Sequence, residues 1–376
     1  MSSKGDINTQ ISLFVQQLKR RQISGSKEVA LATANLLIRY ISARRWTSTE
    51  AMVHQVRELG ARLVDAQPFE FTCGNVVRRV LKSIRTIDEA ISPQGDDEES
   101  DDEKESAASM FGLLSISEDS TDNATTDHKS GLTPGGLFAS EEERTKARDR
   151  RNAVIDEIHL LIDEISNDDP IFKAGIDLVT PQDVILAPCP TSQTVADFIF
   201  RLAAKRNVSI IVTENYPNGV THAKKFVEKL TEHRVPATLI PDAAVYAVMA
   251  KVSKVLISAR AVLANGGCIA SSGVAMACQA AKQFTKPVMM IAGSYKLSPI
   301  YPFDVESLIE VGNSGKVVDF RDAELMNRLE VINPLYDYIA PELVDIVITA
   351  DGGVSPNFVY RLILDNYSTL DQNLAA

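Results

Sequence analysis

The chain has 376 residues, 45% of them hydrophobic, which is enough for two domains of ordinary size with sizeable cores. No window reaches the roughly 18 to 20 consecutive apolar residues of a membrane helix, and no apolar signal segment follows the polar N-terminus. The four cysteines are scattered and the five histidines have no zinc spacing, so we expect a cytoplasmic protein with reduced thiols and neither metal nor other cofactor.

The formal net charge of −11 comes from one segment. Residues 91–143 hold 15 acidic side chains against only Lys104 and Lys129, a net charge of −13 that leaves the rest of the chain at +2. A nearly neutral remainder has no basic footprint, which argues against direct binding of nucleic acid. Mutual repulsion predicts a disordered insert over residues 93–140, and its apolar island at 110–114 either docks on its own domain or binds a partner.

Apolar residues at helical spacing dominate the N-terminal quarter of the chain. They predict antiparallel helices over residues 7–90, the first of them with one face formed by Ile11, Phe14, Val15 and Leu18. The helical pattern resumes at about residue 141. We therefore expect an N-terminal helical domain over residues 7–180, interrupted by the acidic insert.

From residue 184 onward, short β-branched runs alternate with helical patterns. Strands are expected at 184–187, 208–213, 237–240, 255–258, 287–292 and 345–349. Helices are expected at 191–204, 221–233, 242–249, 271–284 and 357–367. This alternation predicts an α/β fold, a Rossmann-like, mostly parallel sheet with helices on both faces, in a C-terminal domain over residues 181–376.

Four segments follow the expected strands at their carboxyl ends, where parallel sheets bind ligands: 188–192, 213–219, 264–273 and 293–299. The glycines of Asn265-Gly266-Gly267 permit close backbone approach, and a helix beginning at Ser271 would favour an anion. The loop matches neither common phosphate-binding signature, so a turn packed against another subunit is favoured over a phosphate cradle or a nucleotide-binding module. Lys296 could supply a charge to an anion, but a lone loop lysine is usually solvated.

Residues 255–267 resemble the signature of a superfamily that joins three regulatory subunits of initiation factor 2B with sugar-phosphate aldose–ketose isomerases. Segments 241–245, 295–299 and 341–345 resemble the regulatory branch of that superfamily. Segments 19–26 and 357–362 are most similar to its beta-type chains. The resemblance covers nearly the whole chain except the acidic insert, and several motifs in the same order make it more specific than any one of them.

The isomerases need a thiol and a carboxylate that face each other across the substrate. Cys189 falls where they place their cysteine. Their aspartate is expected in a Gly-Ala-Asp segment that here ends in Arg260, and the Asn-Gly-Asp that often follows ends here in Gly267. We therefore interpret Cys189 and Arg260 as vestigial isomerase positions and expect no catalytic residue; an isomerase that uses Cys189 is the alternative.

The resemblance implies a regulatory subunit of a guanine-nucleotide exchange factor complex that contains two copies each of five subunits, one of which catalyses exchange. It implies pairing with a delta-type chain, further alpha, gamma and epsilon types, and helical domains that sense the alpha subunit of initiation factor 2 in phosphorylated and unphosphorylated forms. No nucleic acid or membrane partner is expected. The candidate interface residues are Asn265, Gly266, Gly267, Tyr295, Lys296, Leu297, Ser298 and Pro299.

Overall fold

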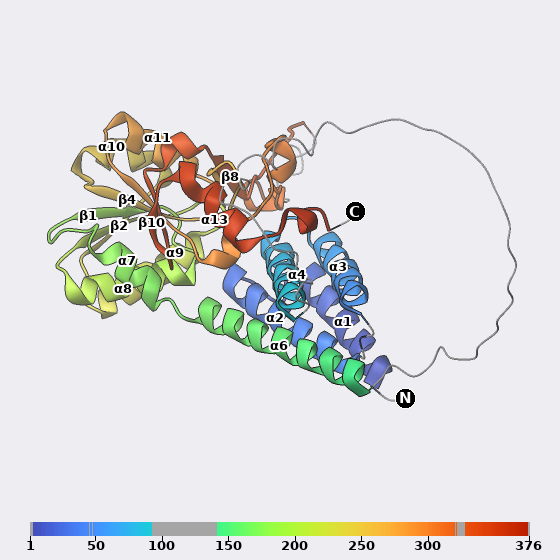
Figure 1. The fold of residues 1–376 in the computed structure, drawn as a ribbon. Helices are drawn as coiled ribbons and strands as arrows, with labels where there is room; N and C mark the ends of the chain where they lie inside the picture. The colour runs from blue at the N-terminus through green and yellow to red at the C-terminus, as the bar shows by residue number, and fades with distance from the viewer. Residues whose placement is uncertain are drawn as a thin grey trace, which may run out of the picture.

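The computed structural model describes residues 3–44, 46, 48–91, 141–319, 321 and 328–374. The chain forms a helical part and a part built around a β-sheet, which lie side by side (Figure 1). The predicted acidic insert and its apolar island lie outside the described residues. Among the helices in the described ranges, none combines the length and the apolar character that crossing a membrane requires.

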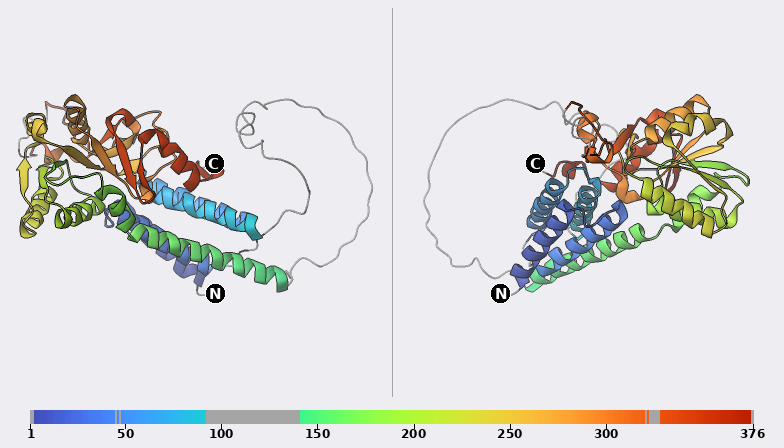
Figure 2. Two further views of the ribbon diagram at one scale, coloured as in Figure 1. Left: turned by 60° about the vertical axis from the view of Figure 1, so that its left-hand side comes forward. Right: turned by 180° about the vertical axis from the view of Figure 1, so that it is seen from behind.

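The helical part is a bundle whose two longest helices, α4 and α6, run alongside each other (Figure 2). Its helices are α1 (Ser3–Lys19), α2 (Ser26–Ala43), α3 (Thr49–Ala66), α4 (Phe71–Ile91) and α6 (Glu141–Ser166). The Ser48 hydroxyl caps α3 by accepting a hydrogen bond from the Ala51 backbone N–H at 3.2 Å. Fully buried aliphatic side chains such as Leu37, Leu63 and Leu81 form the core, as the helical spacing predicts.

The large sheet has seven strands in the order β10-β9-β7-β4-β1-β2-β3. Its strands are β1 (Val184–Ala187), β2 (Ser209–Thr213), β3 (Ala237–Ile240), β4 (Lys254–Ser258), β7 (Val288–Ile291), β9 (Ile346–Thr349) and β10 (Gly352–Val354). All pair in parallel except the edge strand β10. The strand order reverses between β1 and β4, and such a reversal opens a crevice beyond the carboxyl ends of those two strands.

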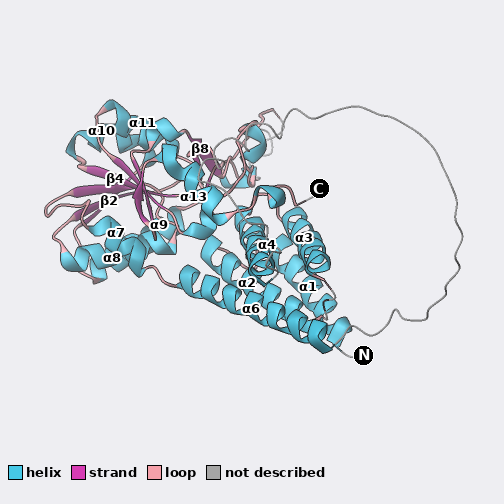
Figure 3. Cartoon of the chain, viewed as in Figure 1, coloured by secondary structure: helices cyan, strands magenta, loops and turns pink. Residues whose placement is uncertain are grey.

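Helices cover both faces of this sheet (Figure 3), which confirms the predicted α/β class. One face packs on α7 (Asp169–Ile176), α8 (Gln193–Lys205) and α9 (Val220–Glu232). The other packs on α10 (Val245–Val248), α11 (Val274–Gln283) and α13 (Val359–Asn366). The α7 segment, which the sequence assigns to the helical domain, lies against β9, β10 and α8.

A second, three-stranded antiparallel sheet was not predicted. Its strands are β5 (Ala261–Val262), β6 (Cys268–Ser271) and β8 (Tyr336–Ile339). The helix expected from Ser271 therefore begins only at Val274. Small residues at 268–271 give no local strand signal, and their pairing partner β8 lies more than sixty residues further along the chain.

Candidate functional site

A cleft of about 570 Å³ opens where the strand order reverses, between the sheet and the helical part. All four segments predicted to follow the strands contribute to its lining, and the start of α2 closes it. Representative lining residues are Thr191, Asn215, Arg260, Ser271, Lys296 and, from α2, Lys27. The cleft therefore occupies the position at which parallel α/β sheets bind ligands.

Cys189 lies beneath this cleft and not among its lining residues. Its side chain is 2% exposed, and the Asn215 amide donates a hydrogen bond to its sulfur. Burial raises the pKa of the Cys189 thiol to about 11, although hydrogen bonds with Ser271 and Thr191 act in the opposite direction. A covered thiol that stays protonated at neutral pH is poorly suited to move protons on a sugar.

Arg260, which the sequence resemblance predicts at the position of the isomerase acid, joins the sheet to the helical part. Its Nη2 lies 2.8 Å from Oε2 of Glu70, in the loop between α3 and α4, and its Nε donates to the Phe69 carbonyl at 3.1 Å. The guanidinium also lies 4.5 Å from the centre of the Tyr336 ring. Because Glu70 is only 3% exposed, this ion pair is largely shielded from water.

Lys296 is buried, so the expectation of a solvated loop lysine is wrong. Its side chain is 4% exposed, and its Nζ lies 3.5 Å from the Ser192 hydroxyl. Burial lowers the pKa of Lys296 to about 8, although the negative charges of Glu70 and Asp168 raise it. The lysine is buried because its loop is held against the bundle, where the Asn75 amide donates to the carbonyl of the neighbouring Tyr295 at 3.1 Å.

The Asn265-Gly266-Gly267 loop is the turn between β5 and β6, so it does not lead directly into a helix. Gly266 has a φ of +82°, and a side chain there would collide with the backbone of Pro356. Asn265 closes the turn by accepting from the Gly267 N–H at 3.0 Å, and its amide donates to the Tyr338 hydroxyl at 2.7 Å. These contacts leave the glycines no space for a phosphate.

Seven of the eight candidate interface residues are buried within the chain, and only Asn265 is partly exposed. The Tyr367 hydroxyl donates to the Leu297 carbonyl at 2.6 Å, and the Ser298 N–H donates to the Val262 carbonyl at 2.8 Å. Buried residues can support an interface but offer no side chain for direct contact with another subunit. Their role in subunit contacts therefore stays a prediction.

Sequence reasoning missed several charged residues at the cleft, because their partners lie far away in the chain. Lys27, whose Nζ lies 2.6 Å from a carboxylate oxygen of Asp168, is one. Glu70, the buried partner of the cleft residue Arg260, was missed for the same reason. Lys316 also lines the cleft. A single sequence carries no signal for pairs that are separated by more than a hundred positions.

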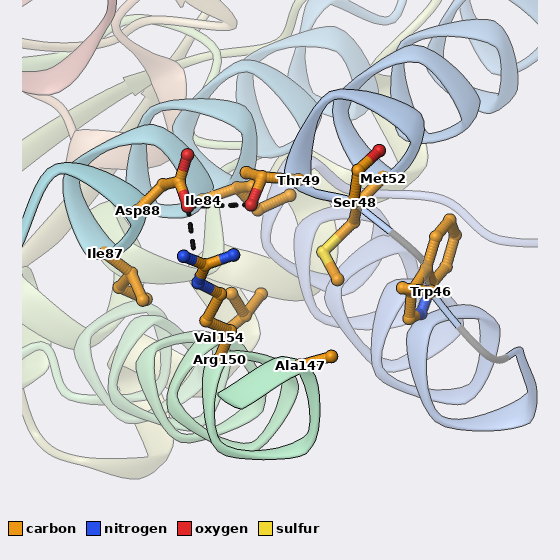
Figure 4. Close-up of a pocket in the computed structure, with 10 residues that line it drawn as sticks. All are labelled: Trp46, Ser48, Thr49, Met52, Ile84, Ile87, Asp88, Ala147, Arg150 and Val154. Carbon is orange, nitrogen blue, oxygen red and sulfur yellow. Dashed lines mark hydrogen bonds and ion pairs between the residues drawn. The ribbon is translucent and has the colours of Figure 1, made fainter. Parts of the chain in front are cut away.

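A second, smaller pocket lies where α3, α4 and α6 meet (Figure 4). Asp88 accepts a hydrogen bond from the Thr49 hydroxyl at 2.8 Å and pairs with Nε of Arg150 at 3.3 Å. The pocket has a volume of about 20 Å³, which is space for one water molecule at most. Its polar groups link three helices, and we assign it a structural role.

Fold and cleft together define a class: an α/β scaffold with a helical bundle packed on it and a cleft where the strand order of its parallel sheet reverses. Residues 22–356 match the Initiation factor 2 subunit family, and the chain belongs to that family. It is 33% identical to "Translation initiation factor eIF2B subunit beta" of Schizosaccharomyces pombe, over 96% of both chains. It is 28% identical to "Ribose 1,5-bisphosphate isomerase" of Pyrococcus furiosus, over 52% of this chain and 60% of that protein.

Solved structures show the same likeness. The chain superposes on eIF2B beta from Chaetomium thermophilum with a TM-score of 0.72 and 28% identity, over 97% of this chain and 94% of that one. It also superposes on a chain of the tetrameric eIF2B-beta2-delta2 complex from C. thermophilum with a TM-score of 0.69 and 28% identity, over 96% and 95%. These matches confirm the predicted family and fold.

Proposed function

We propose that the chain is a non-catalytic, beta-type regulatory subunit of a cytoplasmic guanine-nucleotide exchange factor complex that acts on translation initiation factor 2. Another subunit of the complex catalyses exchange. This chain pairs with a delta-type subunit and, together with alpha, gamma and epsilon types, forms the assembly. Its helical part contacts the alpha subunit of initiation factor 2 and helps to distinguish the phosphorylated from the unphosphorylated form.

One observation supports the proposal: the chain keeps the family scaffold over nearly its whole length, and Arg260 forms an ion pair with Glu70 between the two parts. We interpret Arg260 as standing where the isomerases of the superfamily place their acid, so that this position now holds the helical part on the sheet. The likeness to the beta chain of a beta2-delta2 complex supports the pairing with a delta-type subunit. A single added phosphate changes charge by about −1.5 to −2, which is enough to favour one docked arrangement over another.

The test is a reconstituted complex whose exchange rate is measured on phosphorylated and unphosphorylated substrate. Leu13 and Leu160 are the exposed large aliphatic side chains on the outer helices α1 and α6 of the bundle, 54% and 62% exposed. We expect Leu13→Asp or Leu160→Asp to weaken substrate binding without loss of assembly. Asn152→Asp, which puts the same charge on an exposed polar position of α6, is the control.

Two results would contradict this proposal. One is a complex that assembles without this chain and still responds to phosphorylation. The other is turnover of a sugar phosphate by the purified chain that Cys189→Ala abolishes, which would establish the isomerase alternative.

A further inference from the structure

The last described residues of the chain leave the sheet part and lie across the helical part (Figure 1). Tyr367 ends α13 and is 3% exposed, with its hydroxyl bound to the Leu297 carbonyl. Seven residues later, Leu374 is 6% exposed and belongs to the core of the helical bundle. The segment between them, residues 367–374, is here called the strap.

Asp371 is the central contact of the strap. Its side chain is fully buried, and its carboxylate lies 2.6 Å from Nη2 of Arg57 on α3 and 2.8 Å from Nε of Arg85 on α4. Burial alone would raise the pKa of Asp371, but the hydrogen bonds from Arg85 and Arg57 outweigh it and hold the pKa below its usual value. The carboxylate is therefore ionised at neutral pH and bound by two guanidinium groups.

Three cations on one face of α4 hold the same region. Arg78, Lys82 and Arg85 follow the i, i+4, i+7 spacing of a single helix face. Arg78 Nε donates to the carbonyl of Gln372 at 3.0 Å. Lys82 Nζ donates to the last carbonyls of α13, those of Leu364 at 3.1 Å and Asp365 at 2.6 Å.

Together with the contacts of Lys82 to α13, the strap holds the turns of α4 that lie beyond the contacts near its start. Near its start, α4 is fixed to the sheet part through Phe71, which packs on the small sheet, and through Asn75. Arg79, one turn on, pairs with Glu164 and Ser294. Arg85 lies more than a turn beyond these residues, and Asp371 of the strap accepts its side-chain hydrogen bonds.

We propose that the strap sets the orientation of the helical part on the sheet part and, in the assembled complex, transmits the response to a phosphorylated substrate from one part to the other. The second half of this inference rests on the proposed function, in which the helical part contacts substrate and the sheet part forms the assembly. The first half rests only on the contacts of Asp371, Arg57 and the α4 cations.

The test uses the full chain in the reconstituted complex. Asp371→Asn keeps the shape of the side chain and removes its charge, and Asp365→Asn makes the same change at an exposed position of α13. Spin labels at His54→Cys on α3 and Lys225→Cys on α9 report the distance between the parts, because both positions are exposed while Cys73, Cys189, Cys268 and Cys278 are buried.

For Asp371→Asn we expect a broader label-to-label distance distribution and about tenfold faster hydrogen exchange in the strap and the last turns of α4, since the three hydrogen bonds from Arg57 and Arg85 lose their charged acceptor. Exchange on unphosphorylated substrate should stay near wild type, while inhibition by phosphorylation weakens. Asp365→Asn should change none of these readouts. A chain that ends at Ser368 lacks Asp371 and the rest of the strap beyond that residue and should reproduce the effect.

Unchanged distances and hydrogen exchange in both strap variants would overturn the inference. Broadened distances with full inhibition by phosphorylation would overturn its regulatory half and leave the strap as a structural contact. A wild-type complex that does not respond to phosphorylation would instead contradict the proposed function, while the distance measurement would still decide whether the strap sets the orientation.

Discussion

The two parts of the molecule complete their cores in different ways. The two large clusters that flank the seven-stranded sheet draw only on residues between 171 and 367. The core of the helical bundle also contains Tyr295 and Leu374, which the sheet part supplies. The sheet part is thus largely self-contained and takes only Phe71 of α4 into the small cluster beside its three-stranded sheet, whereas the helical part depends on its neighbour for its main core. Changes at the contact between the parts should therefore affect the helical part first.

The largest loss of stability is expected from substitution of Arg260, which joins the sheet part to the helical part. Arg260→Asp places a carboxylate beside Glu70, which is 3% exposed. Loss of a buried ion pair and the new repulsion should lower the free energy of unfolding by about 3–5 kcal/mol, measured by urea denaturation of the purified chain. Arg260→Lys keeps the charge and should cost less. An unchanged stability of Arg260→Asp would show that the ion pair of Arg260 with Glu70 does not hold the two parts together.

Leu374 offers the next test, since it contributes to the helical core from the far end of the chain. Leu374→Ala removes a side chain that is 6% exposed and should destabilise the chain by about 2–4 kcal/mol. Leu370→Ala is the matched control, because Leu370 belongs to the same segment but is 68% exposed. Equal midpoints of thermal unfolding for the two variants would contradict the view that the bundle is completed by the sheet part.

The sequence predicted six of the seven strands of the large sheet, because those strands are local. It placed the last strand at 345–349 and so missed the edge strand β10, whose sequence Gly-Gly-Val gives no strand signal. Runs such as Val208–Thr213 are apolar and β-branched, and their burial on both faces follows from their composition. The small sheet was missed because β6 has no such run and pairs with a strand more than sixty residues away. Local pattern alone could not reveal this pairing.

The candidate site, too, was predicted only where local sequence features determine it. The sequence predicted which loops meet at the cleft, because strand order brings carboxyl ends together. It did not predict that Arg260 pairs with Glu70, 190 positions earlier, or that Lys296 is buried. It also gave no sign that Asp371 binds Arg85, 286 positions away. These contacts depend on how the helical part packs on the sheet part, and the hydrophobic periodicity of the sequence does not indicate that packing.

Substitution of Asn75 tests the same contact between the helical part and the sheet part, with a smaller expected effect on stability. Asn75→Ala leaves the Tyr295 carbonyl without its 3.1 Å hydrogen bond in a buried place, which should cost about 1–3 kcal/mol of unfolding free energy. Asn35→Ala on α2 is the control, because the Asn35 amide also donates to a backbone carbonyl, that of Leu31, but at the surface. A comparable loss in both variants would mean that the bond to Tyr295 contributes nothing beyond a surface hydrogen bond.

The smallest effect is expected for the reactivity of the cysteines. Their labelling tests whether the Cys189 thiol behaves like the buried thiols of the two cores. Burial raises the pKa of Cys189 to about 11 and those of Cys73 and Cys278 to about 12. At pH 8 only about one Cys189 thiol in a thousand is then a thiolate, so iodoacetamide should label the native chain very slowly, and faster as the pH rises.

Labelling followed by intact-mass measurement decides this comparison, with the urea-unfolded chain as the control in which all four cysteines should react. If Cys189 alone reacted in the native chain at the rate of an exposed thiol, its environment would resemble an active site and not a core. That result would favour the isomerase alternative even though Arg260 replaces the acid. Equally slow labelling of all four cysteines would place Cys189 with the structural thiols, because accessibility and thiolate fraction would then be low at every one of them.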